Sequence, residues 1–205
     1  LNGNDTANVT GTLDTGTTSY EYGILASNDD NKITVSNEGH IITGGDDASG
    51  IYHTGDSNTT TVSGSIKTAG FRARGIYNKG NTNTTTVSGS ITTTGNSSYG
   101  IYNLGSTNTT TVSGSIRTGT GTYAYGIRNF GNNNTTTFSG SIETTGLDGY
   151  GISNVGSSNI TTVSGSIKTE GEEAHGIYNY GDNNTTTISG TVKATGTKSA
   201  ALYNK

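Results

Sequence analysis

The chain contains no proline, cysteine, methionine or tryptophan among its 205 residues, and only 13% of the residues are charged. Without cysteine the fold cannot depend on disulfides, which suits an extracellular protein but does not fix the compartment. No apolar run approaches the ~18 residues that a membrane-spanning helix needs, so we expect no membrane insertion by this segment. The net charge of −4 provides no basic stripe, which argues against nucleic-acid binding.

Apolar residues are also scarce, at 27%, a level at which chains are often disordered. Disordered chains are usually rich in charge and proline, however, whereas this one is rich in Thr, Ser, Asn and 33 glycines, with Ile, Val and Tyr at regular intervals. Thr, Val, Ile and Tyr favour strands, and Gly and Asn favour turns. The composition therefore predicts strands and turns. Because the chain starts at Leu1 and shows no signal peptide, we expect a processed or excised segment.

An internal repeat dominates the sequence. The stretch NTTTVSGSIKTAGFRARGIYN, residues 58–78, recurs as NTTTVSGSITTTGNSSYGIYN at residues 83–103, and the spacing is 25 residues, once 26, along most of the chain. An apolar residue marks the same position in eight copies, the first two being divergent: Val9, Val35, Val62, Val87, Val112, Phe138, Val163 and Ile188. A repeat of this length predicts stacked structural units.

Each copy has the pattern of short strands joined by turns. In TTTVSGSI, alternation places Thr60, Val62 and Ile66 on one side and Thr59 and Thr61 on the other. A second strand is predicted to centre on the isoleucine of the recurring Gly-Ile pair, with a small residue three positions earlier, where the interior narrows. One unit of this size cannot bury its own apolar side, whereas stacked identical units can.

The sequence thus predicts an all-β fold, a single-stranded parallel β-helix (β-solenoid) of about eight coils of 25 residues, in one domain over residues 1–205. The coils are expected to begin near residues 1, 27, 54, 79, 104, 130, 155 and 180. At about 4.8 Å per coil, the rod would be about 38 Å long.

Two asparagine columns follow from the same alignment, and stacked amides can hydrogen-bond along the axis of such a rod. The first column, expected at a turn, comprises Asn78, Asn103, Asn129, Asn154, Asn179 and Asn204. The second comprises Asn58, Asn83, Asn108, Asn134, Asn159 and Asn184. We expect a structural role for both.

At SGSI and GIYN the sequence resembles the β-helical passenger regions of bacterial autotransporters and related surface adhesins. Those regions are rich in Thr, Ser, Asn and Gly and are built from degenerate coils that carry an A-x-G-I turn. The likeness extends over nearly the whole chain and brings no catalytic motif with it. It implies a secreted or cell-surface location and a spacer, adhesive or fibre-forming role, with cell-surface glycans as one class of partner.

Residues that break the repeat are the candidates for catalysis. His40, His53 and His175 stand in different columns or turns, and His53, which replaces the asparagine of other coils, is interpreted as a variant turn residue. The variable loops before the Gly-Ile pairs contain the segments GGDDAS, FRAR and EGEEAH.

Carboxylates beside arginines in those loops could bind calcium and an acidic sugar. A carbohydrate-binding or carbohydrate-active β-helix is therefore one alternative function. We expect the acids and the arginines to lie several coils apart, roughly 10–20 Å, and therefore predict no catalytic residue, no metal site and no cofactor. The protein is not expected to be an enzyme.

Threonines form the most regular candidate surface. Pairs two residues apart fall on the outer side of the first strand: Thr59 and Thr61, Thr84 and Thr86, Thr109 and Thr111, Thr135 and Thr137, and Thr185 and Thr187. On a flat sheet they form rows about 6.7 Å apart with a step of about 4.8 Å. These rows resemble the T-x-T arrays of ice-binding solenoids, so ice binding is a second alternative. Ile160 interrupts one row, and threonine also suits any exposed strand.

A tyrosine column accompanies the Gly-Ile strands, and Arg128 and Ser153 interrupt it. Its members are Tyr52, Tyr77, Tyr102, Tyr178 and Tyr203. Stacked aromatics stabilise a fold beyond the area that they bury, so we interpret this column as structural, with sugar binding as the alternative.

Neither end of the chain carries a recognisable cap, although unpaired strand edges invite pairing and terminal repeats normally differ from the rest. The chain is therefore either a slice of a longer solenoid or a subunit whose end coils stack on other copies. The second interpretation predicts a head-to-tail filament through Leu1, Val9, Leu13, Ile188, Val192, Leu202, Tyr203 and Asn204. We accordingly expect an extracellular structural protein, a β-solenoid subunit that builds a surface or extracellular fibre.

Overall fold

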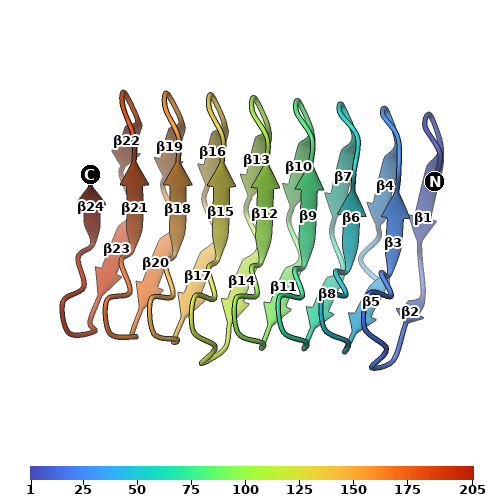
Figure 1. Ribbon diagram of the computed structural model, residues 1–205, viewed down its shortest axis with the longest axis horizontal. Helices are drawn as coiled ribbons and strands as arrows, with labels where there is room; N and C mark the ends of the chain where they lie inside the picture. The colour runs from blue at the N-terminus through green and yellow to red at the C-terminus, as the bar shows by residue number, and fades with distance from the viewer.

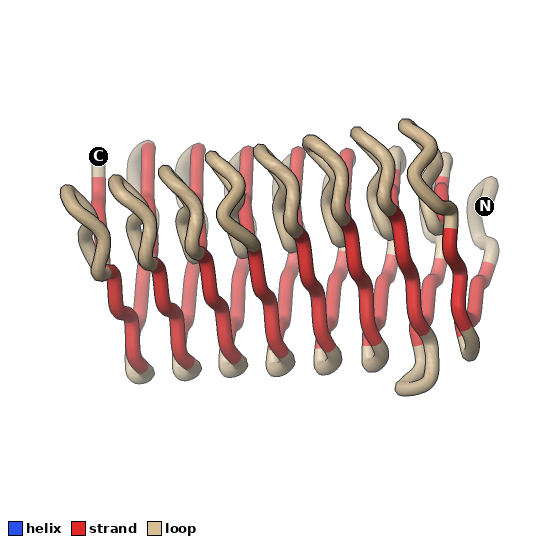
Figure 2. The backbone as a smooth tube through the Cα atoms, turned by 90° about the horizontal axis from the view of Figure 1, so that it is seen from below, coloured by secondary structure: helices blue, strands red, loops and turns tan.

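The computed structural model describes residues 1–205 and consists of 24 β-strands without a helix. Three strands make up each coil, and the coils lie side by side from the N-terminus to the C-terminus along the long axis (Figure 1). Strands at the same position in successive coils form three parallel eight-stranded sheets. The view in Figure 2, turned by 90°, shows the same stack with loops joining the sheets. The predicted all-β solenoid of about eight coils is confirmed. Since every element is a strand, the structure contains no membrane-spanning helix.

The three sheets are named here by their place in the coil. Sheet 1 contains β1 (Thr6–Val9), β4 (Lys32–Val35), β7 (Thr59–Val62), β10 (Thr84–Val87), β13 (Thr109–Val112), β16 (Thr135–Phe138), β19 (Ile160–Val163) and β22 (Thr185–Ile188). Sheet 2 contains β2 (Thr12–Asp14), β5 (His40–Thr43), β8 (Ser65–Thr68), β11 (Ser90–Thr93), β14 (Ser115–Thr118), β17 (Ser141–Thr144), β20 (Ser166–Thr169) and β23 (Thr191–Ala194). Sheet 3 contains β3 (Ile24–Ala26), β6 (Ile51–His53), β9 (Ile76–Lys79), β12 (Ile101–Leu104), β15 (Ile127–Phe130), β18 (Ile152–Val155), β21 (Ile177–Tyr180) and β24 (Leu202–Asn204).

The apolar columns form the core. In one coil, Val62 of sheet 1, Ile66 of sheet 2 and Ile76 of sheet 3 point inward and are almost completely buried. Ile76 is the first residue of its strand rather than the centre, so the prediction for this strand was displaced. The equivalent residues of the other coils, together with Ala26 and Ile33 of the first two coils, complete a cluster of 22 buried side chains. Each contributes roughly 1.5–3 kcal/mol by burial, which explains how 27% apolar residues suffice.

The glycine of each Gly-Ile pair is required by the next coil. A Cβ atom on Gly75 would lie 2.6 Å from the carbonyl oxygen of Gly100 and would also collide with Ile91. Because coils stack at about 4.8 Å, any side chain here would push two coils apart. The recurring Gly-Ile pair is therefore a packing requirement of the stack.

The first asparagine column lies inside the strands of sheet 3, so its expected place at a turn was wrong. These side chains point into the core and are buried over most of the stack. The Nδ2 of Asn78 donates to Oδ1 of Asn103 at 2.7 Å, and the same bond repeats up to Asn204 at 2.7–2.8 Å. From Asn78 to Asn179, each Nδ2 also donates to an inward threonine of sheet 1, as Asn78 does to Thr85 at 3.0 Å. Strand geometry explains the error, because alternation after Ile76 turns Tyr77 outward and Asn78 inward.

The second asparagine column lies at the turn between sheets 3 and 1 and pairs differently. The backbone N–H of Asn83 donates to Oδ1 of Asn108 at 2.9 Å, and the side-chain amide of Asn108 donates to the carbonyl of Gly80 at 3.1 Å. These side chains therefore satisfy backbone groups of neighbouring coils instead of bonding amide to amide.

His53 occupies the first asparagine column within β6, buried in the core, and not at a turn as expected. Its Nε2 lies 2.7 Å from Oγ1 of Thr60. Its Nδ1 and the Oδ1 of Asn78, the next residue of the same column, are both buried without a hydrogen-bond partner. Burial lowers the pKa of His53 to about 4. The histidine is thus a defect at which the asparagine ladder ends.

We predict that His53 makes the protein lose stability as the pH falls from about 6.5 to about 4. Its pKa in the folded protein, about 4, lies below the ordinary value of about 6.5 in the unfolded chain, so the unfolded chain binds the extra proton in this window. The loss should be about 1.4 kcal/mol per pH unit. The substitution His53→Asn should remove most of this slope and add about 1 kcal/mol at neutral pH, because Asn78 Oδ1 gains a donor.

Chemical denaturation at several pH values measures both effects. His40→Asn is the matched control, since His40 is exposed on sheet 2 and lies outside the ladder. His175, whose pKa burial also lowers, leaves a residual slope in every variant. A His53→Asn protein that keeps the full slope would contradict the assignment.

Candidate functional site

The threonine pairs lie on the solvent side of sheet 1. Thr84 pairs with Thr59 and Thr109, and Thr86 pairs with Thr61 and Thr111, so the two rows are in register. The intervening threonines, such as Thr85, point inward and are buried. The rows continue through Thr135 and Thr137 to Thr185 and Thr187, with Ile160, 49% exposed, in one row. This face is a regular array of hydroxyl and methyl groups with one apolar interruption.

A shallow groove of about 600 Å³ runs along the corner between sheets 1 and 2. Serines on both sides and glycines between them line it, and His40 closes one end, with its Nδ1 2.7 Å from Oγ of Ser65. The groove contains no hydrophobic residue and no acid.

The tyrosine column on the outer side of sheet 3 is interrupted at Arg128 and Ser153 as predicted, but the ladder of aromatic rings is continuous. Where Arg128 and Ser153 replace tyrosine, the residues directly before the Gly-Ile pairs supply the rings. The ring centroids lie 4.7–5.6 Å apart along Tyr22, Tyr52, Tyr77, Tyr102, Tyr99, Tyr125, Tyr150, Tyr178 and Tyr203. Sequence reasoning missed Tyr99, Tyr125 and Tyr150. The signal was present, because a Tyr-Gly pair occurs in the coil before the gap and in each of the two coils that lack the column tyrosine.

Most of these rings are stacked nearly parallel, as Tyr52 and Tyr77 are at an interplanar angle of 5°. A ring between two stacked neighbours has both faces covered, so it cannot also stack on a sugar. Burial raises the pKa of Tyr77 and of Tyr150 to about 12, and their hydroxyls therefore remain protonated at neutral pH. The middle of the ladder is structural, and open ring faces are confined to its ends.

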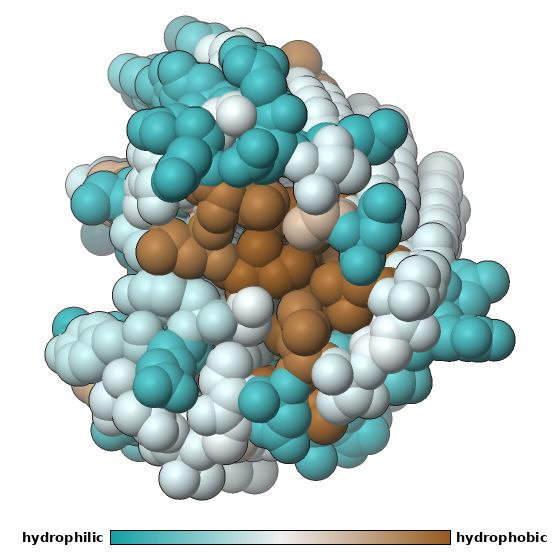
Figure 3. All heavy atoms as spheres, turned by 90° about the vertical axis from the view of Figure 1, so that its right-hand side faces the viewer, coloured by the Kyte–Doolittle hydropathy of each residue, from teal (hydrophilic) through white to brown (hydrophobic).

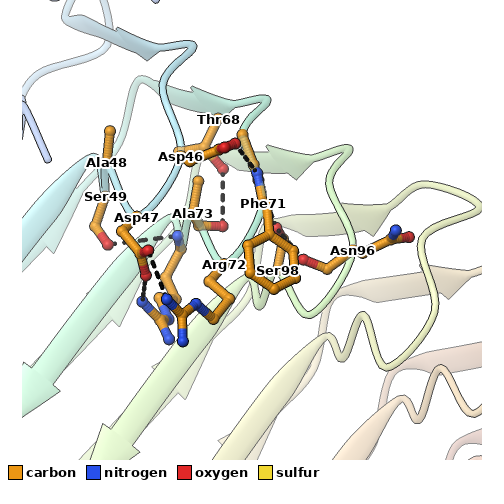
Figure 4. A network of polar contacts seen from close by, with 12 residues as sticks. Asp46, Asp47, Ala48, Ser49, Thr68, Phe71, Arg72, Ala73, Asn96 and Ser98 are labelled. Carbon is orange, nitrogen blue, oxygen red and sulfur yellow. Dashed lines mark hydrogen bonds and ion pairs between the residues drawn. The ribbon is translucent and has the colours of Figure 1, made fainter. Parts of the chain in front are cut away.

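The acids and arginines of the variable loops lie closer together than expected. Asp47 and Arg72 occupy the same position of successive coils, and Arg72 Nη2 lies 2.9 Å from Asp47 Oδ2 (Figure 4). Arg74 reaches the same carboxylate, with its Nη1 3.6 Å from Asp47 Oδ1. The expected separation of several coils is wrong for this cluster, because GGDDAS and FRAR belong to adjacent coils.

The EGEEAH loop forms a separate group near the C-terminal end. Lys198 lies 3.3 Å from Glu172 and 3.0 Å from Glu173, and His175 stacks between the rings of Tyr150 and Tyr203. The two acidic loops do not converge. No group of three or more His, Cys, Asp or Glu side chains in the structure is arranged to hold a metal ion.

The two ends of the rod expose strand edges and apolar core. At the N-terminal end, β1, β2 and β3 each have a neighbour on one side only, and at the C-terminal end so do β22, β23 and β24. Figure 3 shows apolar side chains gathered at the centre of the N-terminal end, with polar residues around them. Leu13 at this end is 38% exposed, and Ile188 and Leu202 at the other end are each 39% exposed.

The remaining residues predicted for end contacts also lie at these surfaces. Leu1 and Val192 are partly buried and pack against the core cluster. Val9 is buried beneath the end, and Tyr203 and Asn204 are exposed. Equivalent inward positions in the middle coils, such as Val62, are fully covered. The ends therefore expose apolar positions of the kind that the middle coils bury.

No protein-family model matches this chain, and no curated protein or solved structure is significantly similar to it.

Proposed function

We propose that this chain is an extracellular structural protein whose solenoid rods stack head to tail into a fibre. The observation that carries the proposal is the match between the two open ends. Each end offers three strand edges around exposed apolar residues, and the C-terminal end of one copy has the same three-sheet cross-section as the N-terminal end of another. Unpaired edges of this kind pair readily with further strands.

The register of the stack follows from continuing the columns of each sheet. In a second copy, β1 would lie on β22, β2 on β23 and β3 on β24. The inward positions would then join Val9 to Ile188, Leu13 to Val192 and Ile24 to Leu202 in three apolar contacts. Two other inward columns would set Ala7 against Thr186 and Ala26 against Asn204. Leu13 is 38% exposed, so covering the remainder of its side chain contributes about 0.6–1.1 kcal/mol, since full burial of a leucine is worth roughly 1.5–3 kcal/mol.

Charge also favours this junction. On the outer side of sheet 2, Lys193 is the last residue of a column, and it pairs with Lys168 of the coil before it. The first residue of that column is Asp14, which pairs with Ile42. A second copy in the continued register would bring Asp14 opposite Lys193, and opposite charges across a strand pair contribute about 0.2–1 kcal/mol.

A contact between unlike ends does not close on itself, so it propagates into a filament. The extracellular location and an adhesive role rest on the resemblance to autotransporter passenger regions, with cell-surface glycans as the corresponding partners. The threonine rows, the serine groove and the outer face of sheet 3 would run continuously along such a fibre.

We predict that the 205-residue chain assembles into filaments with an axial repeat of about 38 Å, the height of eight coils. Leu13→Arg should weaken assembly at least tenfold, because an unpaired charge would be buried in the junction. Asp14→Lys should weaken it more mildly, and adding Lys193→Asp to that variant should restore it. Sedimentation velocity over a concentration series and electron microscopy measure these effects.

Lys67→Asp is the matched control, because Lys67 lies in the same column as Asp14 and Lys193 but in the middle of the rod. A wild-type chain that remains monomeric at high concentration, or assembly that tolerates Leu13→Arg, would overturn the proposal.

Ice binding is a second candidate function, favoured by the in-register threonine rows of sheet 1. A flat array of repeated hydroxyl and methyl groups can order water at fixed spacings, and its rows are about 6.7 Å apart with a step of about 4.8 Å.

Thermal hysteresis is the measurement that tests this candidate. If ice is the ligand, Thr86→Tyr and Thr111→Tyr should each abolish the activity, since a bulky side chain interrupts the flat face. Thr92→Tyr on the outer side of sheet 2 is the control. A wild-type protein without hysteresis rules out this candidate.

A further inference from the structure

A cavity of about 260 Å³ lies where the tyrosine ladder begins. Its walls are four tyrosines from three successive coils, Tyr20, Tyr22, Tyr52 and Tyr77. Asp47, Arg72 and Arg74 complete the lining. This volume is just below the lower end of the range of typical ligand pockets, about 300–1,000 Å³, so the cavity suits one ring-sized group rather than an oligomer.

The cavity has an excess of one positive charge, because two arginines share one carboxylate. Arg72 takes the short contact with Asp47. The Arg74 side chain is only 14% exposed, its nearest carboxylate oxygen is 3.6 Å away, and its buried Nε has no hydrogen-bond partner. Its guanidinium lies over the ring of Tyr77 at 5.0 Å. Buried polar groups normally have hydrogen-bond partners. Arg74 therefore has unused hydrogen-bond donor capacity next to the cavity.

The tyrosines at this end still have free surface. Tyr22 has a single ring neighbour and is tilted by 57° to Tyr52 instead of stacking on it. Tyr20 makes no ring contact and is 64% exposed. Unlike the covered rings of the middle coils, these two can offer a face to the C–H groups of a ligand, while their hydroxyls serve as hydrogen-bond donors and acceptors.

We propose that this cavity binds a carboxylated sugar residue, a uronic acid, with its carboxylate on Arg74 and Arg72 and its ring against Tyr20 and Tyr22. The planar guanidinium fork matches a carboxylate in two parallel hydrogen bonds. A single negative charge balances the excess charge of the cavity, whereas a phosphate would bring more charge than the cavity neutralises. The inference does not require assembly into fibres, since one rod supplies every lining residue, although Tyr20 and Tyr22 belong to the first coil and therefore lie next to the junction of the proposed fibre.

In this arrangement Asp47 competes with the ligand's carboxylate for Arg72 and Arg74, so removing its charge gives a specific test. Methyl glucuronoside is the probe, with methyl glucoside and acetate as the separate ring and charge controls, measured by titration calorimetry or NMR shifts of the tyrosine rings. Asp47→Asn should raise the affinity for methyl glucuronoside about tenfold, the equivalent of one charge-assisted hydrogen bond. Asn also tolerates the positive φ of 54° at position 47.

Arg74→Gln should abolish binding, and Arg72→Gln, at a side chain that is 48% exposed, should reduce it about tenfold without affecting folding. Arg128→Gln is the matched control. Arg128 lies against the rings of Tyr99 and Tyr125 in the same way and also has an unpartnered Nε, but it does not line the cavity. The proposal is overturned if methyl glucoside or acetate binds as well as the glucuronoside, if Asp47→Asn does not strengthen binding, or if Arg128→Gln weakens it like Arg74→Gln.

Discussion

Hydrogen bonding between coils, parallel to the rod axis, is the constraint on which the rest of this structure depends. A coil places only about three apolar side chains in the interior, too few to offset the entropy of ordering some 25 residues. Each coil therefore relies on its neighbours for strand pairing, for burial and for partners of its polar groups. The columns of identical residues are the result. A residue that hydrogen-bonds to or packs on its counterpart in the next coil can make the same contact in every coil. The sequence repeats for that reason.

The same constraint shapes what the outer surface can offer. Because each outward position is also a column, chemistry on this protein appears as rows: threonines on sheet 1, serines at the corner and tyrosines on sheet 3. A localised site requires a break in the rows. The clearest break is in the first three coils, where Asp47 and two arginines replace the residues found elsewhere and the ring of Tyr22 leaves the stack.

Periodicity was sufficient to predict the fold, because the valine and Gly-Ile columns can be aligned without knowing any distance. It also identified which side of TTTVSGSI is buried. Periodicity did not predict the full tyrosine ladder, because residues of two different columns build it. The ladder passes from Tyr102 to Tyr99 and back to the column at Tyr178, a path that no single column reveals. The Asp47–Arg72 pair was missed for a simpler reason, since the coil boundary between GGDDAS and FRAR was not used to place them side by side. The orphaned Nδ1 of His53 depends on side-chain orientation, which the alignment does not contain.

The asparagine ladder of sheet 3 also gives the rod a direction. Every side-chain amide from Asn78 to Asn179 donates toward the C-terminal end, and every one from Asn103 to Asn204 accepts from the N-terminal side. The interior thus contains a row of parallel dipoles, and the two ends differ electrically even where their apolar residues are alike. Two rods that met by the same end would oppose these dipoles, whereas rods that follow one another would add them. Any structure built by extending this interior would be a polar one, with distinguishable ends at every length.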